Sequence, residues 1–124
     1  MFVVGDVTER TISTPNATMV GLAAPSRGSV ELSSWRVRMA AGSAGPEHAV
    51  DREQVWMPVD GALEFTVDGE ATVVGPGEAA VLPADATRRV RTVDGPAEAL
   101  VCMRVGGMVI VTGEAERRSL PWAE

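Results

Sequence analysis

The sequence predicts an all-β fold built from short antiparallel strands. Val, Thr and other β-forming residues alternate with polar residues in short runs, which Gly or Pro interrupts at intervals of about ten residues. The dipeptide Asp68-Gly69 lies between two such runs and is typical of a two-residue hairpin turn, because both central positions favour positive φ. No segment has a sustained helical period, and the expected helical structure is limited to a short turn near 114–119. This pattern is typical of a β-sandwich or β-barrel.

The expected strands are separated by residues that interrupt a ladder of backbone hydrogen bonds. The strands are predicted near 2–4, 18–22, 30–40, 48–50, 53–60, 62–67, 71–74, 79–82, 86–92, 98–105 and 108–112. Asp60-Gly61 separates two of them, and the glycine-rich segment 75–77 cannot continue a strand.

The length of the chain favours one compact domain. A chain of 124 residues can bury about two thirds of the surface that its unfolded form exposes, which is enough for one core. We expect a single domain over 1–124 with its core at about 30–112. Residues 1–29 and the tail 113–124 are expected to wrap the barrel or a dimer partner, and we expect a homodimer because an unpaired edge strand favours association.

Composition excludes several classes of function. The net charge is −6 and the acidic residues are spread along the chain, which argues against a nucleic-acid surface. No apolar run approaches the ~20 residues that a bilayer span needs, so we expect no membrane association. The single cysteine, Cys102, excludes an internal disulfide and fits a reducing compartment. A cytoplasmic protein with a small-molecule substrate is the expectation.

Two stretches carry a more specific signal. Residues 45–61 read GPEHAVDREQVWMPVDG and resemble the first motif of the cupin family, in which two histidines one residue apart precede a glutamate, six residues and a glycine. Counting back from Gly61 places Gln54 at the glutamate, Val50 at the second histidine and His48 at the first. Residues 77–88 read GEAAVLPADATR and resemble the second cupin motif, with Arg88 at its histidine position.

The resemblance covers roughly residues 30–110 and implies an antiparallel double-stranded β-helix, the jelly-roll barrel of the cupins. Cupins often bind a divalent metal inside the barrel and serve as dioxygenases, isomerases, epimerases, cyclases or ligand-binding modules. The fold alone therefore does not select a function.

The residues at the four ligand positions are poorly suited to a metal. A divalent cation needs three or four donors at about 2.0 to 2.2 Å, with imidazole and carboxylate the suitable groups. Val50 donates nothing, the permanent charge of Arg88 repels a cation, and the amide of Gln54 is a weak neutral donor. Acidic residues within 47–53 lie in a loop or are expected to point away from Gln54. We expect no metal and no other cofactor.

The period of two along a strand predicts which side chains share a face. His48 and Val50 share one, and Gln54 and Trp56 share another. Arg38 lies on the polar face of strand 30–40, which looks either into the pocket or out to solvent. In the strand that follows residue 98, one of two alternating sets lines the cavity, and Met103 belongs to the apolar set.

These positions suggest acid–base chemistry without a metal. His48 can donate or accept a proton near neutral pH, Arg88 can stabilise developing negative charge, and Gln54 can fix a carbonyl or hydroxyl group. Trp56 offers a flat wall for a ring. The candidate catalytic residues are His48, Arg88 and Gln54, and the candidate substrate contacts are Trp56, Arg38, Glu64 and Met103. If Arg88 points inward, it requires an acidic partner such as Glu64 or an anionic ligand, whereas a shift of register would expose it.

Three functions remain open from the sequence. The first is a metal-independent cyclase or isomerase of a small organic metabolite, and the resemblance to small cupins implies a bacterial specialised pathway such as polyketide ring formation. The second is a binding or sensor domain without catalysis. The third is a metal-dependent oxygenase with an unusual ligand set.

Overall fold

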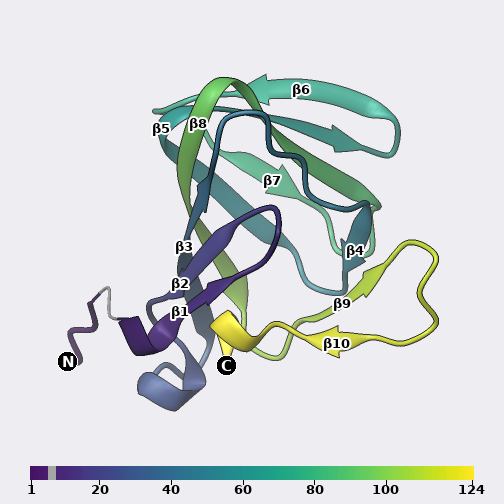
Figure 1. Cartoon of the computed structure of the whole chain (residues 1–124). Helices are drawn as coiled ribbons and strands as arrows, with labels where there is room; N and C mark the ends of the chain where they lie inside the picture. The colour runs from purple at the N-terminus through teal and green to yellow at the C-terminus, as the bar shows by residue number, and fades with distance from the viewer. Residues whose placement is uncertain (6–7) are drawn as a thin grey trace.

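The protein is a curled antiparallel sheet, described by a computed structural model for residues 1–5 and 8–124 (Figure 1). Its strands are β1 (Thr11–Ser13), β2 (Thr18–Gly21), β3 (Leu32–Met39), β4 (His48–Val50), β5 (Gln54–Val67), β6 (Glu70–Val74), β7 (Ala80–Leu82), β8 (Arg88–Arg104), β9 (Met108–Val111) and β10 (Arg118–Ser119). Short 3-10 helices are η1 (Thr8–Arg10), η2 (Pro25–Arg27) and η3 (Pro121–Ala123). The predicted all-β antiparallel fold is confirmed. No helix in the described ranges is long and apolar enough to cross a membrane.

Strands β5 and β8 pair with each other and form the frame of the sheet. The two strands keep one register over the first part of β5 and another after residue 62, with shifts on both sides of Asp60. Such irregularities bend a strand without ending it and increase its twist. This explains why β5 is one strand where the sequence predicted two, at 53–60 and 62–67. The same holds for β8, predicted as 86–92 and 98–105.

Strands from the N-terminal and C-terminal parts of the chain extend the sheet on either side of β5 and β8. β1 and β2 continue the sheet beyond β3, while β9 joins β4 to β10. The tail then returns as η3, which packs against β1, β2 and β3 (Figure 1). The buried hydroxyl of Ser33 donates to the carbonyl of Ala123 at 2.6 Å and fixes this end. The short helical turn expected near 114–119 is wrong, because β10 occupies the end of that segment, and the strand predicted near 2–4 does not form.

Alternating side chains of the strands supply the core. The buried apolar residues of β3 are Trp35, Val37 and Met39, and those of β8 include Val101 and Met103. The rings of Trp56 and Phe65 on β5 meet edge to face, with centroids 5.5 Å apart and planes at 77°. Offset and edge contacts of this kind suit the charge distribution of aromatic rings.

Two turns need positive φ. Asp68 and Gly69 have φ of 48° and 86° between the paired residues Val67 and Glu70, so the predicted hairpin is confirmed. Gly61, at the irregular part of β5, has φ of 69°, and a Cβ placed there would lie 2.2 Å from the carbonyl oxygen of Pro96. The bend of the frame therefore requires the absence of a side chain at position 61.

Gly61→Ala is expected to lower the free energy of unfolding by about 3 kcal/mol, because it adds both a positive-φ penalty and a clash with backbone. Gly69→Ala is the matched control, since its φ is also positive but nothing lies within 4 Å of the added Cβ. Its cost is expected to be about 1 kcal/mol. Urea denaturation of the three proteins measures the difference, and equal losses for the two variants would contradict the assigned close approach.

Candidate active site

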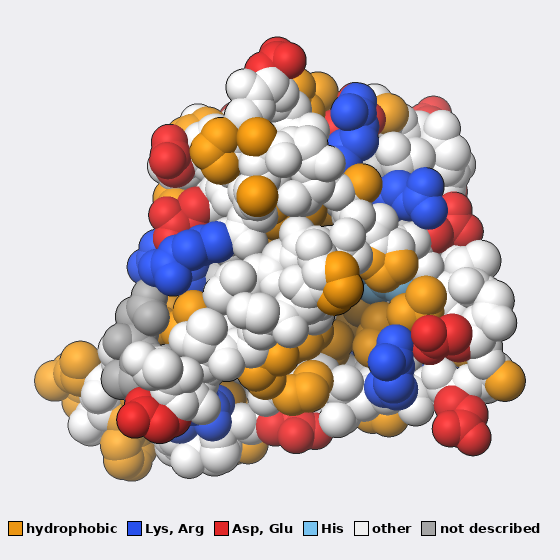
Figure 2. All heavy atoms as spheres, in the orientation of Figure 1, with side chains coloured by type: hydrophobic (Ala, Val, Ile, Leu, Met, Phe, Trp, Pro, Cys, Tyr) orange, Lys and Arg blue, Asp and Glu red, His pale blue; other side chains and the backbone are white. Residues whose placement is uncertain are grey.

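A cavity of about 690 Å³ lies inside the curled sheet. Its mouth is visible in Figure 2 as a hollow with hydrophobic side chains on its walls and charged ones around the rim. The lining is mostly apolar and comprises Ile12, Thr14, Pro15, Asn16, Ala17, Met19, Trp35, Val37, Met39, Gly45, Pro46, His48, Val50, Gln54, Trp56, Val90, Val109, Val111, Arg118, Ser119, Leu120, Pro121 and Trp122. A cavity of this size suits an organic ligand of several rings.

Strand β3 forms one wall. Its apolar residues, among them Trp35 and Met39, face the cavity, and its arginines face outward. Arg36 and Arg38 both contact the Glu98 carboxylate on β8, at 2.9 and 3.1 Å. The sequence left open whether this polar face looks inward, and the structure places it at the surface. Arg38 therefore lies away from the cavity, contrary to its expected substrate contact.

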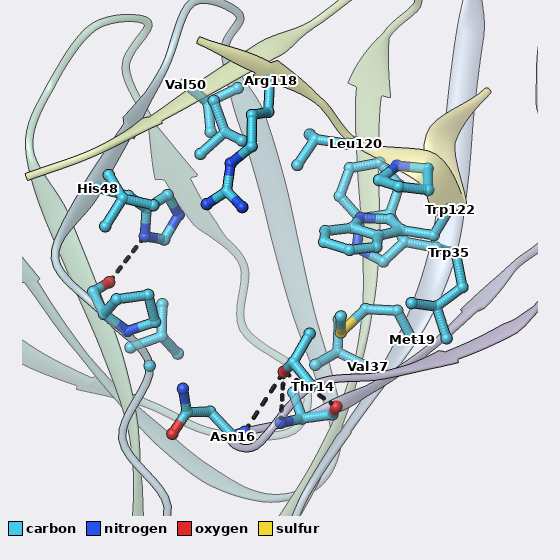
Figure 3. A pocket seen from close by; sticks show the side chains of 18 of the residues that line it. Thr14, Asn16, Met19, Trp35, Val37, His48, Val50, Arg118, Leu120 and Trp122 are labelled. Atoms are coloured by element: carbon cyan, nitrogen blue, oxygen red, sulfur yellow. Dashed lines mark hydrogen bonds between the residues drawn. The ribbon is translucent and has the colours of Figure 1, made fainter. Parts of the chain in front are cut away.

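The opposite wall carries His48 on β4. The ring atom Nδ1 of His48 lies 2.9 Å from the carbonyl oxygen of Pro46 (Figure 3). A carbonyl oxygen can only accept a hydrogen bond, so Nδ1 carries the proton in the neutral ring and Nε2 is left as a base. Burial lowers the pKa of His48 below 6.5; the Pro46 hydrogen bond raises it, and the charge of Arg88 lowers it further. The imidazole is therefore neutral at pH 7.

Gln54 on β5 also lines the cavity and has a fixed amide orientation. Its Oε1 accepts from Trp56 Nε1 at 3.1 Å and from Arg88 Nη1 at 3.3 Å. Indole and guanidinium groups only donate, so the amide oxygen must face them. Gln54 Nε2 then lies 3.6 Å from Met103 Sδ and retains one further N–H. Gln54 thus contributes a hydrogen-bond donor to the cavity wall.

Arg88 lies behind Gln54 and not at the surface of the cavity. Its side chain is 1 % exposed, and it donates to the carbonyl oxygens of Ala86 at 2.8 Å and Pro83 at 2.7 Å as well as to Gln54. Burial lowers the pKa of Arg88, while the charges of Asp68 and Asp85 raise it.

The expected acidic partner of Arg88 is elsewhere. Glu64 instead accepts from Arg91 at 2.6 Å on the outside of the sheet, so it does not contact the cavity. The Arg91 hydrogen bond lowers the pKa of Glu64. The register explains the difference: Glu64 on β5 lies directly opposite Arg91 on β8, whereas Arg88 lies opposite Val67. Neutral carbonyl groups, and no carboxylate of the described residues, are the direct partners of Arg88.

The structure therefore separates the seven predicted site residues. His48, Gln54 and Trp56 line the cavity, Arg88 and Met103 lie behind its wall, and Arg38 and Glu64 lie outside. The loop 14–17 and the segment 118–122 also line the cavity, and the sequence did not predict them as site residues. The only indication in the sequence was the apolar end of the tail, which was expected to wrap the barrel or a dimer partner and not to line a cavity.

Comparison with known proteins identifies the family. Residues 35–103, more than half of the chain, match the Cupin domain family. The chain is a cupin. Within this cupin, the matched region contains every candidate catalytic residue and excludes the loop 14–17 and segment 118–122 that complete the cavity.

Solved structures share the cupin fold. The polyketide cyclase RemF from Streptomyces resistomycificus superposes with a TM-score of 0.74 at 19% identity, covering 91% of this chain and 82% of that one. The DMSP lyase DddQ from Ruegeria pomeroyi gives 0.69 at 22% identity, covering 93% and 64%. A sugar phosphate isomerase from Silicibacter pomeroyi gives 0.67 at 18% identity, covering 86% and 77%. At these identities the likeness shows the fold alone.

A curated relative matches a shorter segment. Homogentisate 1,2-dioxygenase from Rhodopseudomonas palustris is 37% identical over 57 residues, which is 46% of this chain and 13% of that protein. This cupin therefore spans a small part of that dioxygenase.

The metal that the cupin family implies does not fit the residues present. The ligand positions hold His48, Val50, Gln54 and Arg88, and the Gln54 oxygen already accepts two hydrogen bonds. A guanidinium would repel a cation placed beside it. Within residues 1–5 and 8–124, no three His, Cys, Asp or Glu side chains are grouped so that they could hold a metal. The donor set is therefore unsuited to a divalent metal.

Arg88→Met is expected to lower the free energy of unfolding by about 3 kcal/mol, because the carbonyl oxygens of Pro83 and Ala86 lose their buried donor. Arg89→Met is the matched control, since Arg89 is the exposed neighbour on the same strand, and its effect should be under about 0.5 kcal/mol. Urea denaturation measures both. Equal stability of the two variants would rule out a structural role for the Arg88 hydrogen bonds.

Stability is expected to depend on the titration of His48. Its pKa is lowered in the folded protein, so below pH 6.5 the unfolded state binds more protons than the folded state. The free energy of unfolding should therefore be fully retained above pH 6.5 and should fall as the pH decreases below it. The carboxyls of Glu64 and Glu98 also have lowered pKa values, but they act below pH 4.5.

Urea denaturation between about pH 5 and pH 8 measures this dependence. In His48→Gln, the free energy of unfolding should no longer fall as the pH decreases just below 6.5. The loss of stability at more acidic pH, where carboxyl groups are protonated, should remain. An identical decline in the variant would assign the effect to other groups.

Proposed function

We propose that this cupin is a metal-independent enzyme, a cyclase or isomerase that acts on a small organic metabolite by acid–base catalysis in the barrel cavity. The observation that supports this most directly is the fixed tautomer of His48. Its Nδ1–H is engaged by Pro46, and its pKa is lowered, so Nε2 is an unprotonated base at the wall of a mostly apolar cavity.

The proposed reaction begins with removal of a proton from a carbon next to a carbonyl group. His48 Nε2 takes the proton, the C–H electron pair forms an enolate, and the remaining N–H of Gln54 donates to the enolate oxygen. In an isomerisation, the imidazolium returns the proton to another atom of the substrate. In a cyclisation, the enolate carbon forms a bond to a second carbonyl carbon, and the imidazolium protonates the alkoxide that results. Neither route needs an oxidant or a further reactant.

Polyketide-type substrates suit this chemistry because they contain several carbonyl groups with acidic C–H bonds between them. The polyketide cyclase RemF, one of the structural neighbours, gives independent support for ring closure as an activity that this fold can carry. Trp56 and Trp35 on the cavity wall would contact the flat rings of such a substrate. We place the enzyme in bacterial specialised biosynthesis and in the cytoplasm.

A homodimer is part of the proposal. The outer faces of β5 and β7 expose Met57, Val59 and Val81, which are 37%, 45% and 58% exposed. A second copy of the chain would cover this apolar surface.

Two other functions have less support. A non-catalytic binding or sensor domain would use the same cavity but does not explain a base held in one tautomer. A metal-dependent oxygenase would match the activity named for the homogentisate dioxygenase relative, but the donor set described above lacks its ligands.

Deuterium exchange into a β-diketone tests the proposal. The protein is expected to accelerate exchange at the central carbon of benzoylacetone in D2O, followed by NMR. His48→Gln should slow the catalysed exchange about 100-fold or more, because it removes the base. EDTA should leave the rate unchanged. The pH profile should reach its plateau near neutral pH, since the pKa of His48 is below 6.5.

Binding of the same probe, measured by tryptophan fluorescence, is the control for His48→Gln and should be retained. Unchanged exchange in the variant would exclude His48 as the base. Tight binding without exchange in the native protein would favour a binding module, and loss of exchange with EDTA would restore the oxygenase hypothesis.

A further inference from the structure

One permanently charged side chain lines the cavity. Among the described lining residues, Arg118 on β10 is the one with a permanently charged side chain, because His48 is neutral at pH 7. The remaining walls are apolar or neutral and polar. Arg118 can therefore set the orientation of a charged ligand, because no other described lining residue carries a permanent charge that would compete with it.

The pairing of strands explains why Arg118 faces inward. Arg118 lies directly opposite Val109 on β9, and Val109 lies opposite Val50 on β4. Residues directly opposite in antiparallel strands share a face, and both valines line the cavity. Figure 3 shows the Arg118 guanidinium pointing into the cavity, on the same side as the His48 ring.

The resting partner of Arg118 holds it only weakly. Glu114 Oε2 lies 3.1 Å from Arg118 Nη2, and the two side chains are 48% and 60% exposed. Exposed pairs of this kind contribute little to stability. An anionic ligand group can therefore replace the Glu114 carboxylate without a large cost.

The adjacent Arg117 provides a natural comparison. It pairs with Asp51 at 3.3 Å, is 55% exposed and does not line the cavity. The two neighbouring arginines have similar exposure and each pairs with a carboxylate, but only the Arg118 side chain reaches the cavity.

We propose that Arg118 binds the anionic group of the substrate. The cavity then takes a flat, aromatic or multi-ring organic anion, with a carboxylate or ionised enol at Arg118 and its rings among the apolar walls. Trp35 and Trp122 provide aromatic wall surface for those rings (Figure 3). This inference rests on the proposed function only in calling the ligand a substrate, because anion binding by Arg118 does not require His48 to act as a base.

The experiment compares 2-naphthoate with the neutral 2-naphthamide. All three tryptophans of the protein line the cavity, so quenching of their fluorescence reports binding directly. Arg118→Gln is expected to weaken naphthoate binding about tenfold and to leave naphthamide binding within about twofold, because only the carboxylate loses a charged donor. Arg117→Gln should change neither. Glu114→Gln should tighten naphthoate binding about twofold, since it removes the competing carboxylate.

Arg118→Lys keeps the charge and should retain most of the preference for naphthoate, which separates loss of charge from damage to β10. The proposal is overturned if naphthoate does not bind the native protein, if Arg118→Gln leaves its affinity unchanged, or if Arg117→Gln weakens it equally.

His48→Gln distinguishes this proposal from the catalytic one. A variant that loses deuterium exchange but still prefers naphthoate supports both, and native protein that binds naphthoate without exchange supports the Arg118 proposal alone.

Discussion

The buried guanidinium of Arg88 stabilises the candidate site from the side of the wall that faces away from the cavity. It is almost fully buried and donates to two backbone carbonyls before β8 and to the Gln54 oxygen on β5. These bonds fix the orientation of the Gln54 amide, and the charge of Arg88 lowers the pKa of His48. A guanidinium can do this because its five donors form a rigid fork. It stands at a position where the cupin motif has a metal ligand, so the protein contains a fixed cation of its own there.

The cavity wall carries two kinds of polar group. His48 and Gln54 provide a neutral base and a donor in the wall, whereas Arg118 provides a permanent charge. Both sets of groups reach the same mostly apolar cavity. A fixed cation in the cavity wall can orient an anionic substrate relative to the base.

Much of the fold followed from local pattern. Alternation and turn residues predicted the strand positions, and Asp68-Gly69 predicted its hairpin because positive φ is a property of the residues themselves. The sequence predicts strand ends at the bends of β5 and β8, since a glycine that bends a strand and one that ends it have the same local sequence. In the site, motif spacing located His48, Gln54 and Trp56. Strand alternation left the direction of Arg38 open, because the direction of a polar face depends on which neighbouring strand covers the other side. The suggested pairing of Glu64 with Arg88 does not form, because the register places Glu64 opposite Arg91.

The sequence by itself determined the family, the all-β class and the mismatch between the motif and a metal, because these depend on residue type and spacing alone. Only the tertiary structure decided that Arg88 is buried among carbonyl groups and that Glu64 pairs with Arg91 instead. It also decided that Arg118, 70 residues after His48 in sequence, shares its cavity. The physical reason is register: pairing through β9 sets which side chains of β4 and β10 share a face, and no local pattern encodes that pairing.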